Sequence, residues 1–280
     1  MTAEITQPDY ESFRLFLHDA CGILLGAASQ KQVRRRLLRI LGDHGLAGLP
    51  ELADRLAGPG RNALREQVID LLTRAESRWF TDELAFRFIA EQWLPAQGLP
   101  TQARNHVDRP LAIWSAACCT GEEPYGVAML IEEFREAHPG RLADVTIVAT
   151  DVAKGLLDTA RQGEYDLMTG EDGLSAARRA AFFSQTGPDR WQVSPELRAR
   201  VGFRKLNLRE QSLPAGFDLV LCRNVLRYFT ANVRQDLLTR VHRSLNPGGY
   251  LVLASTEAIS GLTDLYEPVQ CSPGIVYRKK

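Results

Sequence analysis

The sequence predicts an α/β protein in which a doubly wound, mostly parallel sheet follows an all-helical N-terminal domain. Two observations support this fold class. Residues 10 to about 90 of the 280 carry apolar side chains at helical spacing and contain no convincing strand. After Pro110, short apolar runs alternate with amphipathic helices, and this order is typical of a parallel sheet covered by helices.

The N-terminal part is expected to form a series of short helices. Gly58-Pro59-Gly60 interrupts the helical pattern. A polar stretch over 95–110, with Pro, Gly, Gln and Asn, is typical of a linker. We therefore expect a helical domain over 1–94, a linker over 95–110 and a sheet domain over 111–280. The expected helices cover residues 10–20, 29–43, 50–57, 61–74 and 80–93.

The expected strands of the second domain are short and apolar, as suits strands that a parallel sheet buries on both faces. They cover residues 111–117, 145–149, 201–206, 217–222 and 250–254, and helices are expected over 122–137, 153–161 and 230–244. Residues 246–249 (Asn-Pro-Gly-Gly) predict a turn before the last of these strands. A helix over 174–183, a hairpin around Gly187-Pro188-Asp189 and a C-terminal hairpin over 269–277 complete the prediction.

The composition argues against several classes of protein. Lys plus Arg and Asp plus Glu each total 34, so the formal net charge is zero and no nucleic-acid partner is expected. The five cysteines have no CxxC spacing and the histidines no ligand spacing, so neither a disulfide framework nor a metal site is expected. The polar N-terminus is unlike a signal peptide, and no apolar run approaches the roughly 20 residues of a membrane span. We therefore expect a cytoplasmic protein without membrane insertion.

Parallel sheets bind ligands outside the carboxyl ends of their strands, so the residues after each strand are the candidates for a site. The first strand runs into Cys118–Tyr125, which contains a single glycine and lacks the GxGxxG fingerprint. Glu122 and Glu123 at the start of the next helix suit the helix dipole and repel a pyrophosphate. A cofactor with a cationic or hydroxyl-bearing end fits this loop better than NAD or ATP. Alternatively, both glutamates only stabilise the helix terminus.

The other strand ends are polar as well. Asp151 follows the second strand, where a carboxylate either holds ribose hydroxyls or caps the next helix. Asn207, followed by Leu208, ends the third strand, and its amide can pair with an adenine edge. The fourth strand ends in Cys222–Phe229, which carries Arg, Asn and Tyr side chains. Polar groups at all four strand ends favour one cofactor site over four separate caps.

Several segments of this chain together resemble the CheR-type chemoreceptor methyltransferases. They are SAACCTGEEPYGVA, ATD, FRKLNL, FDLVLCRNVLRYF and NPGGYLVL, and the resemblance extends from the helical region to the ending VQCSPGIVYR. It implies a sheet domain of the S-adenosylmethionine-dependent methyltransferase type, with S-adenosyl-L-methionine as cofactor. The implied reaction is methylation of glutamate side chains of bacterial chemoreceptors, and the implied partner is the cytoplasmic domain of a methyl-accepting chemoreceptor.

The resemblance also implies roles for single residues. Glu123 matches the glutamate beside the methionine end of the cofactor, and Asp151 matches the ligand of its ribose. Tyr228 matches the tyrosine near the transferred methyl group, which makes it the catalytic candidate. Residues 163–200 match an inserted subdomain that docks a receptor tail in some members. The remaining implied cofactor contacts are Asn207, Leu208, Arg223 and Asn224.

One segment departs from the pattern of the resembled family, whose members carry an Asn-x-Thr-x-x-Phe-Arg segment before the linker. Ala75 stands at the Asn position, Ser77 at the Thr position and Thr81 at the Arg position. The hydroxyl of Ser77, which we predict to contact the cofactor, and the aromatic pair Trp79-Phe80 are all that remain of it.

The lost arginine matters for the implied chemistry. A glutamate carboxylate is ionised at pH 7 and needs no general base, so catalysis depends on aligning the reacting atoms and orienting the carboxylate. An arginine fork is the natural clamp for a carboxylate, and losing one charged hydrogen bond costs about 1.5–3 kcal/mol. Two alternatives remain for Arg74 and Arg78, which both lie within one helical turn of the segment. Either one of them replaces the lost arginine, or both simply point to solvent.

Three functional hypotheses follow from the resemblance and the departure. The first is an active protein-glutamate O-methyltransferase of chemotaxis adaptation. The second is a catalytically weak or inactive regulator that binds the cofactor and the receptor. The third and weaker one is a small-molecule methyltransferase on the same fold.

The helix expected over 29–43 is strongly basic on one side. Its cations are Lys31, Arg34, Arg35, Arg36 and Arg39, and apolar Val33, Leu37, Ile40 and Leu41 occupy the opposite face. In the resembled family the corresponding helix meets the acidic, glutamate-bearing methylation region of the receptor. We therefore predict that the five cations bind the receptor through complementary charge. Alternatively, they form only a solvated face.

Two pairs of residues are expected to serve packing alone. Cys118 and Cys119 lie beside the cofactor loop, where small side chains are needed, and packing is favoured over a nucleophilic role. Trp114 and Trp191 are expected in the core.

Overall fold

The structure is a computed structural model that describes residues 5–21, 30–57, 62–72, 77–98, 109–166, 173–209 and 212–280. The chain divides into two compact units. The first comprises Met1–Arg74 with Val225–Arg234, and the second comprises Ala75–Asn224 with Gln235–Lys280. Arg74 and Ala75, which the sequence singles out, lie outside the described residues.

The first unit contains the predicted N-terminal helices. They are α1 (Gln7–Cys21), α2 (Gln30–Asp43), α3 (Leu49–Ala57) and α4 (Asn62–Leu72), followed much later in the chain by the short η4 (Leu226–Tyr228). Their apolar faces form a core of their own, in which Leu37, Leu41 and Leu52 are completely buried. Helical periodicity is therefore a reliable guide to this part of the chain, since burial follows the spacing that the sequence shows.

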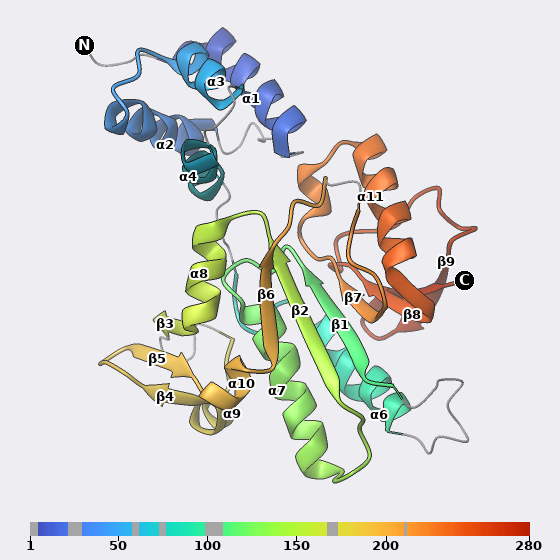
Figure 1. Cartoon of the computed structure of the whole chain (residues 1–280). Helices are drawn as coiled ribbons and strands as arrows, with labels where there is room; N and C mark the ends of the chain where they lie inside the picture. The colour runs from blue at the N-terminus through green and yellow to red at the C-terminus, as the bar shows by residue number, and fades with distance from the viewer. Residues whose placement is uncertain are drawn as a thin grey trace. The chain divides into compact units, whose positions relative to one another are not determined.

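The second unit is built on a mostly parallel sheet of seven strands (Figure 1). The strands are β1 (Leu111–Ala116), β2 (Val145–Asp151), β6 (Val201–Lys205), β7 (Phe217–Leu221), β8 (Leu245–Val252), β9 (Tyr266–Cys271) and β10 (Gly274–Lys279). Their order is β6-β2-β1-β7-β8-β10-β9, and the neighbouring strands from β6 to β8 are parallel. The predicted doubly wound sheet is confirmed, and its C-terminal hairpin is antiparallel.

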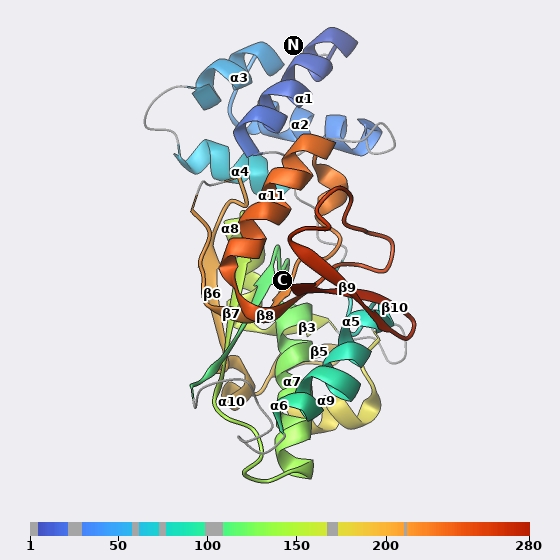
Figure 2. The ribbon, with the colours of Figure 1, turned by 90° about the vertical axis from the view of Figure 1, so that its right-hand side faces the viewer.

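Helices cover this sheet. They are α5 (Glu83–Phe88), the π-helix η2 (Ile89–Trp93), α6 (Leu94–Gln97), α7 (Glu122–Ala137), α8 (Lys154–Gln162) and α11 (Ala231–Ser244). All of them except α11 contribute side chains to the main buried cluster of the sheet. Figure 2 shows α5, α6 and α7 on the same side of the sheet. Trp93, Val127 and Ile147 belong to one buried cluster, so the helices that precede β1 pack in the same core as the sheet.

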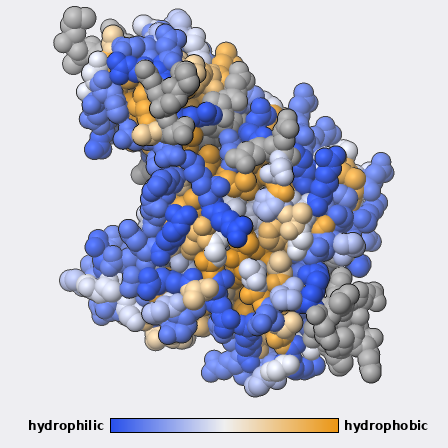
Figure 3. Space-filling view, viewed as in Figure 1, coloured by the Kyte–Doolittle hydropathy of each residue, from blue (hydrophilic) through white to orange (hydrophobic). Residues whose placement is uncertain are grey.

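A small antiparallel sheet lies beside the main one, next to α8 (Figure 1). It consists of β3 (Glu164–Asp166), β5 (Arg190–Val193) and β4 (Phe183–Gln185) in that order, with α9 (Ala176–Phe182) and α10 (Pro195–Arg198). Tyr165, Phe183 and Val193 turn into the main core, whereas hydrophilic residues dominate the outer surface of this region in Figure 3. The small sheet is therefore anchored by one apolar face.

The Asn-Pro-Gly-Gly segment interrupts the regular pairing of β8. Leu245 pairs with Phe217 and Tyr250 with Leu219, so residues 246–249 lie where the register shifts, and Gly248 has φ of 72°. This fits the turn predicted before residues 250–254. A Cβ on Gly249 would lie 3.1 Å from the carbonyl oxygen of Phe217. Glycine here permits a close approach of two backbones, in addition to its better-known use in turns.

Within the described residues, no helix is both long and apolar enough to cross a membrane. Over the same part of the chain, no group of three His, Cys, Asp or Glu side chains is placed to hold a metal ion. The thiols of Cys118, Cys119, Cys222 and Cys271 are free.

Candidate functional site

The loops at the carboxyl ends of β1 and β7, and the loop before α5, contain strained backbone. Among the described residues, the non-glycine residues with positive φ are Phe80, Asp82, Ala117, Cys119 and Asn224, with φ between 50° and 63°. Such conformations cost of order 1–3 kcal/mol each and cluster at ligand sites. Strain is not visible in residue type or spacing, so the sequence prediction could not include it. It also explains why the helix expected over 80–93 begins only at Glu83.

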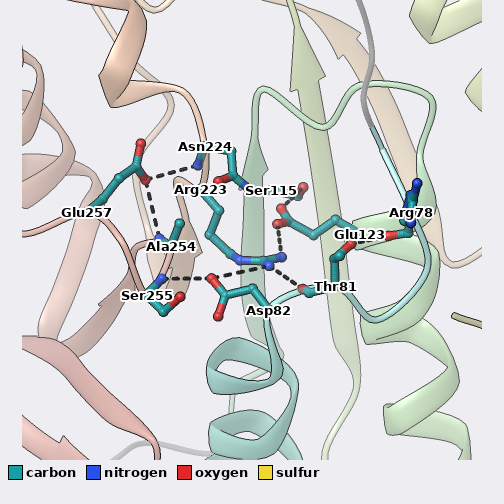
Figure 4. A network of polar contacts seen from close by, with 10 residues as sticks. All are labelled: Arg78, Thr81, Asp82, Ser115, Glu123, Arg223, Asn224, Ala254, Ser255 and Glu257. Atoms are coloured by element: carbon teal, nitrogen blue, oxygen red, sulfur yellow. Dashed lines mark hydrogen bonds and ion pairs between the residues drawn. The ribbon is translucent and has the colours of Figure 1, made fainter.

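Arg223 lies at the centre of a polar network just after β7 (Figure 4). One terminal nitrogen, Nη1, donates to Glu123 Oε2 at 2.7 Å. The other, Nη2, donates to the backbone carbonyl of Thr81 and lies 3.7 Å from Asp82 Oδ2. The Arg223 side chain is only 5% exposed, so these two carboxylates compensate its buried positive charge. Its remaining donor, Nε, is buried without a protein partner.

Both carboxylates of the network have a second partner as well (Figure 4). The hydroxyl of Ser115 on β1 donates to Glu123 Oε1 at 2.6 Å. The backbone N–H of Ser255 donates to Asp82 Oδ2 at 2.7 Å. Asp82 is a site residue that the sequence prediction missed, although its position directly after the predicted segment 75–81 was a signal.

Asn224 follows Arg223 and has a left-handed conformation, with φ of 58°. Its N–H donates to Glu257 Oε2 at 3.0 Å, and the N–H of Ala254 donates to the same oxygen at 3.3 Å. The Asn224 side chain is exposed. Glu257 therefore holds the backbone at Asn224, a role that no motif in the sequence indicated.

Asp151 at the end of β2 is buried and binds the loop that follows β1. Its Oδ2 accepts from the N–H of Cys119 at 3.0 Å, and its Oδ1 accepts from the N–H of Ala153 at 2.9 Å. The N-cap position of α8 belongs to Ala153, so Asp151 is not the N-cap of that helix. These two bonds hold the carboxylate at the end of β2, and its contact with ribose hydroxyls stays a prediction.

The two glutamates at the start of α7 have different partners. Glu122 is buried, accepts from the Thr120 hydroxyl at 2.7 Å, and also hydrogen-bonds the hydroxyl of Ser77. Burial raises the pKa of Glu122. Glu123 faces Arg223 instead. Both glutamates therefore do more than stabilise a helix terminus. The contact with Glu122 also places Ser77, a predicted cofactor contact, against the start of α7.

Asn207 and Leu208 follow β6, beside the end of β2. The two strand ends are joined by a bond from the N–H of Leu206 to the carbonyl of Asp151 at 3.0 Å. The Asn207 side-chain oxygen accepts from the N–H of Arg209 at 3.0 Å, and Leu208 is buried. The structure thus brings these residues to the same end of the sheet as Asp151.

Tyr228 belongs to the first unit and lies in η4. Its side chain is 37% exposed, and its hydroxyl oxygen accepts from Arg227 Nη2 at 3.1 Å. Its catalytic role stays a prediction.

The five basic residues of α2 do not share one environment. Lys31, Arg35 and Arg39 are exposed. Arg34 and Arg36 are half-buried; Arg34 donates to the Gln7 side chain and Arg36 to the carbonyl of Leu71. The opposite face carries the buried residues Val33, Leu37, Ile40 and Leu41. The exposed three are therefore the part of this face that is available to a partner.

The cysteines beside the site are poor nucleophiles. Cys118 is buried, and burial raises the pKa of its thiol well above the usual value. Burial likewise raises the pKa of Cys119 to about 12. Both thiols stay protonated near neutral pH, which fits the predicted packing role. Trp114 is fully buried as predicted, and Trp191 is half-buried against the core.

Comparison with known protein families finds a match for each of the two units, and both matches belong to the same family. A family model described as "CheR methyltransferase, SAM binding domain" matches residues 75–275, and one described as "CheR methyltransferase, all-alpha domain" matches residues 8–73.

Curated relatives match along nearly the whole chain. "Chemotaxis protein methyltransferase Cher2" of Pseudomonas putida is 44% identical over 274 residues, covering 97% of this chain and 98% of the relative. "Chemotaxis protein methyltransferase 1" of Pseudomonas aeruginosa has the same identity and coverage. "Chemotaxis protein methyltransferase 1" of Vibrio cholerae is 41% identical over 283 residues, covering 100% of both chains.

Proposed function

Because this chain belongs to the CheR methyltransferase family, we propose that it methylates glutamate side chains of bacterial chemoreceptors. The products are glutamate methyl esters and S-adenosylhomocysteine. The proposal rests mainly on the contacts that join the ends of neighbouring strands. Arg223 after β7 binds Glu123, and Asp151 at the end of β2 accepts a hydrogen bond from the loop after β1.

Family membership confirms the predicted resemblance, the fold type, S-adenosylmethionine as cofactor and a methyltransferase activity in chemotaxis. The alternative of an inactive regulator is not favoured, since relatives that match nearly the full chain are named chemotaxis protein methyltransferases. The receptor and its glutamates are inferred from the family resemblance.

The residues at the site fit the charge and hydrogen-bonding groups of the cofactor. We assign its amino acid end, which carries an ammonium and a carboxylate, to Glu123 and to the buried Arg223, whose Nε has no protein partner. We assign its ribose to Asp151 and its adenine to Asn207 and Leu208. When bound, S-adenosylmethionine supplies an electrophilic methyl group on a positively charged sulfur. Ser77 and Asn224 complete the proposed set.

The chain itself has little proton chemistry to perform. The acceptor carboxylate is ionised near neutral pH and attacks without a general base. The site residues must therefore position it, exclude water and keep oxygen, carbon and sulfur in line. We propose that Tyr228 helps to position the reacting groups, as the resemblance implies. A small-molecule acceptor remains the weaker alternative.

The proposed function is tested with a labelled methyl group on S-adenosylmethionine and a purified cytoplasmic receptor fragment. We expect label in the receptor that mild base releases as methanol, because carboxylate methyl esters hydrolyse in base and methylated amines do not. Label that resists base would contradict a glutamate ester. A protein that consumes cofactor only with small molecules would support the alternative acceptor.

Asp151→Asn tests the assignment of the ribose. The substitution keeps the shape of the side chain but replaces one carboxylate oxygen by an NH2 group. This donor would face the N–H of Cys119 or of Ala153, so one hydrogen bond is lost. The side chain is also a weaker acceptor for the ribose hydroxyls. We expect the Kd for S-adenosylhomocysteine, measured by calorimetry, to rise about tenfold or more. Asp158→Asn, on the exposed surface of α8, is the control and should bind as wild type.

The exposed cations of α2 are proposed to meet the acidic methylation region of the receptor. We expect Arg35→Glu combined with Arg39→Glu to weaken receptor binding about tenfold or more, and wild-type binding to weaken as salt is added. The cofactor affinity should stay unchanged. The control is Arg243→Glu with Arg278→Glu, which alters the same net charge at exposed positions elsewhere. Equal loss in both double variants would indicate a net-charge effect and contradict the docking face.

The remaining predictions concern the organisation of the chain and its location. We propose that residues 163–200 act as an inserted subdomain and that the protein works in the cytoplasm. The predicted limit of the helical domain at 94 differs from the division of the two compact units, which lies between Arg74 and Ala75. The free thiols of Cys119 and Cys271 are consistent with a reducing compartment.

A further inference from the structure

Tyr165 lies on β3 of the small sheet, yet its side chain reaches the loop that follows β1. Its hydroxyl donates to the backbone carbonyl of Thr120 at 2.6 Å. The side chain is buried, and burial raises the pKa of its hydroxyl. The phenol is therefore neutral and acts as a hydrogen-bond donor at any physiological pH.

The loop that Tyr165 contacts has little freedom at this point. Gly121 has φ of +98°, and a Cβ on it would lie 2.9 Å from Ala160 Cβ and 3.1 Å from the Tyr165 hydroxyl oxygen. Cys119 in the same loop has a left-handed conformation and donates to Asp151. The loop is thus held by Asp151 on one side and by Tyr165 on the other.

The ring of Tyr165 also contacts the loop before α5. It packs edge-on against Trp79, with ring centroids 5.1 Å apart, and Phe183 of β4 packs on the same indole at 5.3 Å. Gly173 approaches the Trp79 backbone so closely that a Cβ would lie 2.1 Å from its carbonyl oxygen. The small sheet therefore touches both loops that carry predicted cofactor contacts.

We propose that Tyr165 is a positioning residue for cofactor binding, which acts through its bond to the Thr120 carbonyl. This bond holds the strained loop 117–121 in the conformation that presents Glu122 and Glu123, so the small sheet sets the affinity for the cofactor. The inference rests on the proposed assignment of the cofactor to these strand ends.

The test compares two tyrosines that make the same kind of bond. Tyr266 is buried, and its hydroxyl donates to the carbonyl of Leu238 at 2.8 Å, among residues of α11 and β9 that the site does not use. Tyr165→Phe and Tyr266→Phe each remove one hydroxyl, and thermal unfolding reports the loss of stability in both. Calorimetry with S-adenosylhomocysteine reports affinity without turnover.

We expect Tyr165→Phe to raise the Kd for S-adenosylhomocysteine and the KM for S-adenosylmethionine about fivefold, as the loss of one neutral hydrogen bond predicts. The kcat at saturating cofactor should change by less than about twofold, because the reacting atoms are untouched once the cofactor is bound. Tyr266→Phe should lower Tm comparably and leave both cofactor constants unchanged.

Three results would overturn the inference. Wild-type affinity in Tyr165→Phe, with weakened binding in Asp151→Asn, rejects the role of Tyr165 and leaves the cofactor assignment standing. Equal weakening in Tyr165→Phe and Tyr266→Phe shows a general loss of stability instead. Wild-type affinity in both Tyr165→Phe and Asp151→Asn rejects the cofactor assignment itself, and the inference with it.

Discussion

Arg223→Met is expected to abolish measurable cofactor binding and to lower the free energy of unfolding by about 3–5 kcal/mol. The guanidinium is buried and joins Glu123, Asp82 and the carbonyl of Thr81. Methionine fills similar space but leaves the half-buried carboxylates of Glu123 and Asp82 without their cation. Calorimetry with S-adenosylhomocysteine and urea denaturation measure the two effects.

Arg109→Met is the matched control for this variant. Arg109 makes a two-pronged pair with Asp218, with one bond of 3.0 Å, at the start of β1 and away from the strand ends of the site. Its side chain is 35% exposed, so we expect a smaller loss of stability and unchanged cofactor affinity. Wild-type affinity in Arg223→Met would show that the pair with Glu123 does not serve the cofactor.

Thr81→Arg is expected to raise kcat for receptor methylation about tenfold or more. The Thr81 side chain is exposed and its hydroxyl donates only to the carbonyl of Arg78, at 2.8 Å. The backbone carbonyl that holds Arg223 is kept in the variant. The introduced guanidinium restores the carboxylate clamp that the family resemblance places here. Steady-state kinetics with receptor fragment as the varied substrate measures the gain.

The neighbouring Arg78 provides the competing explanation. Its side chain is exposed and points away from the Arg223 network in Figure 4. If Arg78 already serves as the clamp, Arg78→Ala should reduce kcat strongly and Thr81→Arg should add little. Thr81→Met controls for side-chain length without charge, and a gain equal to that of Thr81→Arg would contradict the electrostatic account.

Much of the fold follows from patterns that the sequence displays. The apolar face of α2 is buried at the spacing that a helix dictates, and the run that forms β1 is buried on both faces as a parallel strand requires. The polar strand ends lie together because parallel strands share a carboxyl edge. The sequence pattern alone therefore predicts that Asp151 and Asn207 lie at one end of the sheet.

Other features depend on tertiary contacts that no local pattern encodes. β3 is only three residues long, too short for alternation to be recognised, and yet it carries Tyr165. The left-handed backbone at Asp82 delays the start of the expected helix to Glu83, and a distant N–H, that of Ser255, binds the Asp82 carboxylate. Glu257 is likewise brought to Asn224 only by the fold, because it follows β8 and binds the N–H of Asn224. Such pairs join positions that are far apart in the sequence.

The central claim is that this protein esterifies glutamates of a chemoreceptor, and peptide mass mapping tests it most directly. The protein is incubated with S-adenosylmethionine and a cytoplasmic receptor fragment, which is then digested and analysed. We expect a mass gain of one methyl group on specific glutamates, its loss after mild base, and no gain when those glutamates are replaced by glutamine. Tight binding of S-adenosylhomocysteine with no methylated glutamate in any receptor fragment would contradict the account.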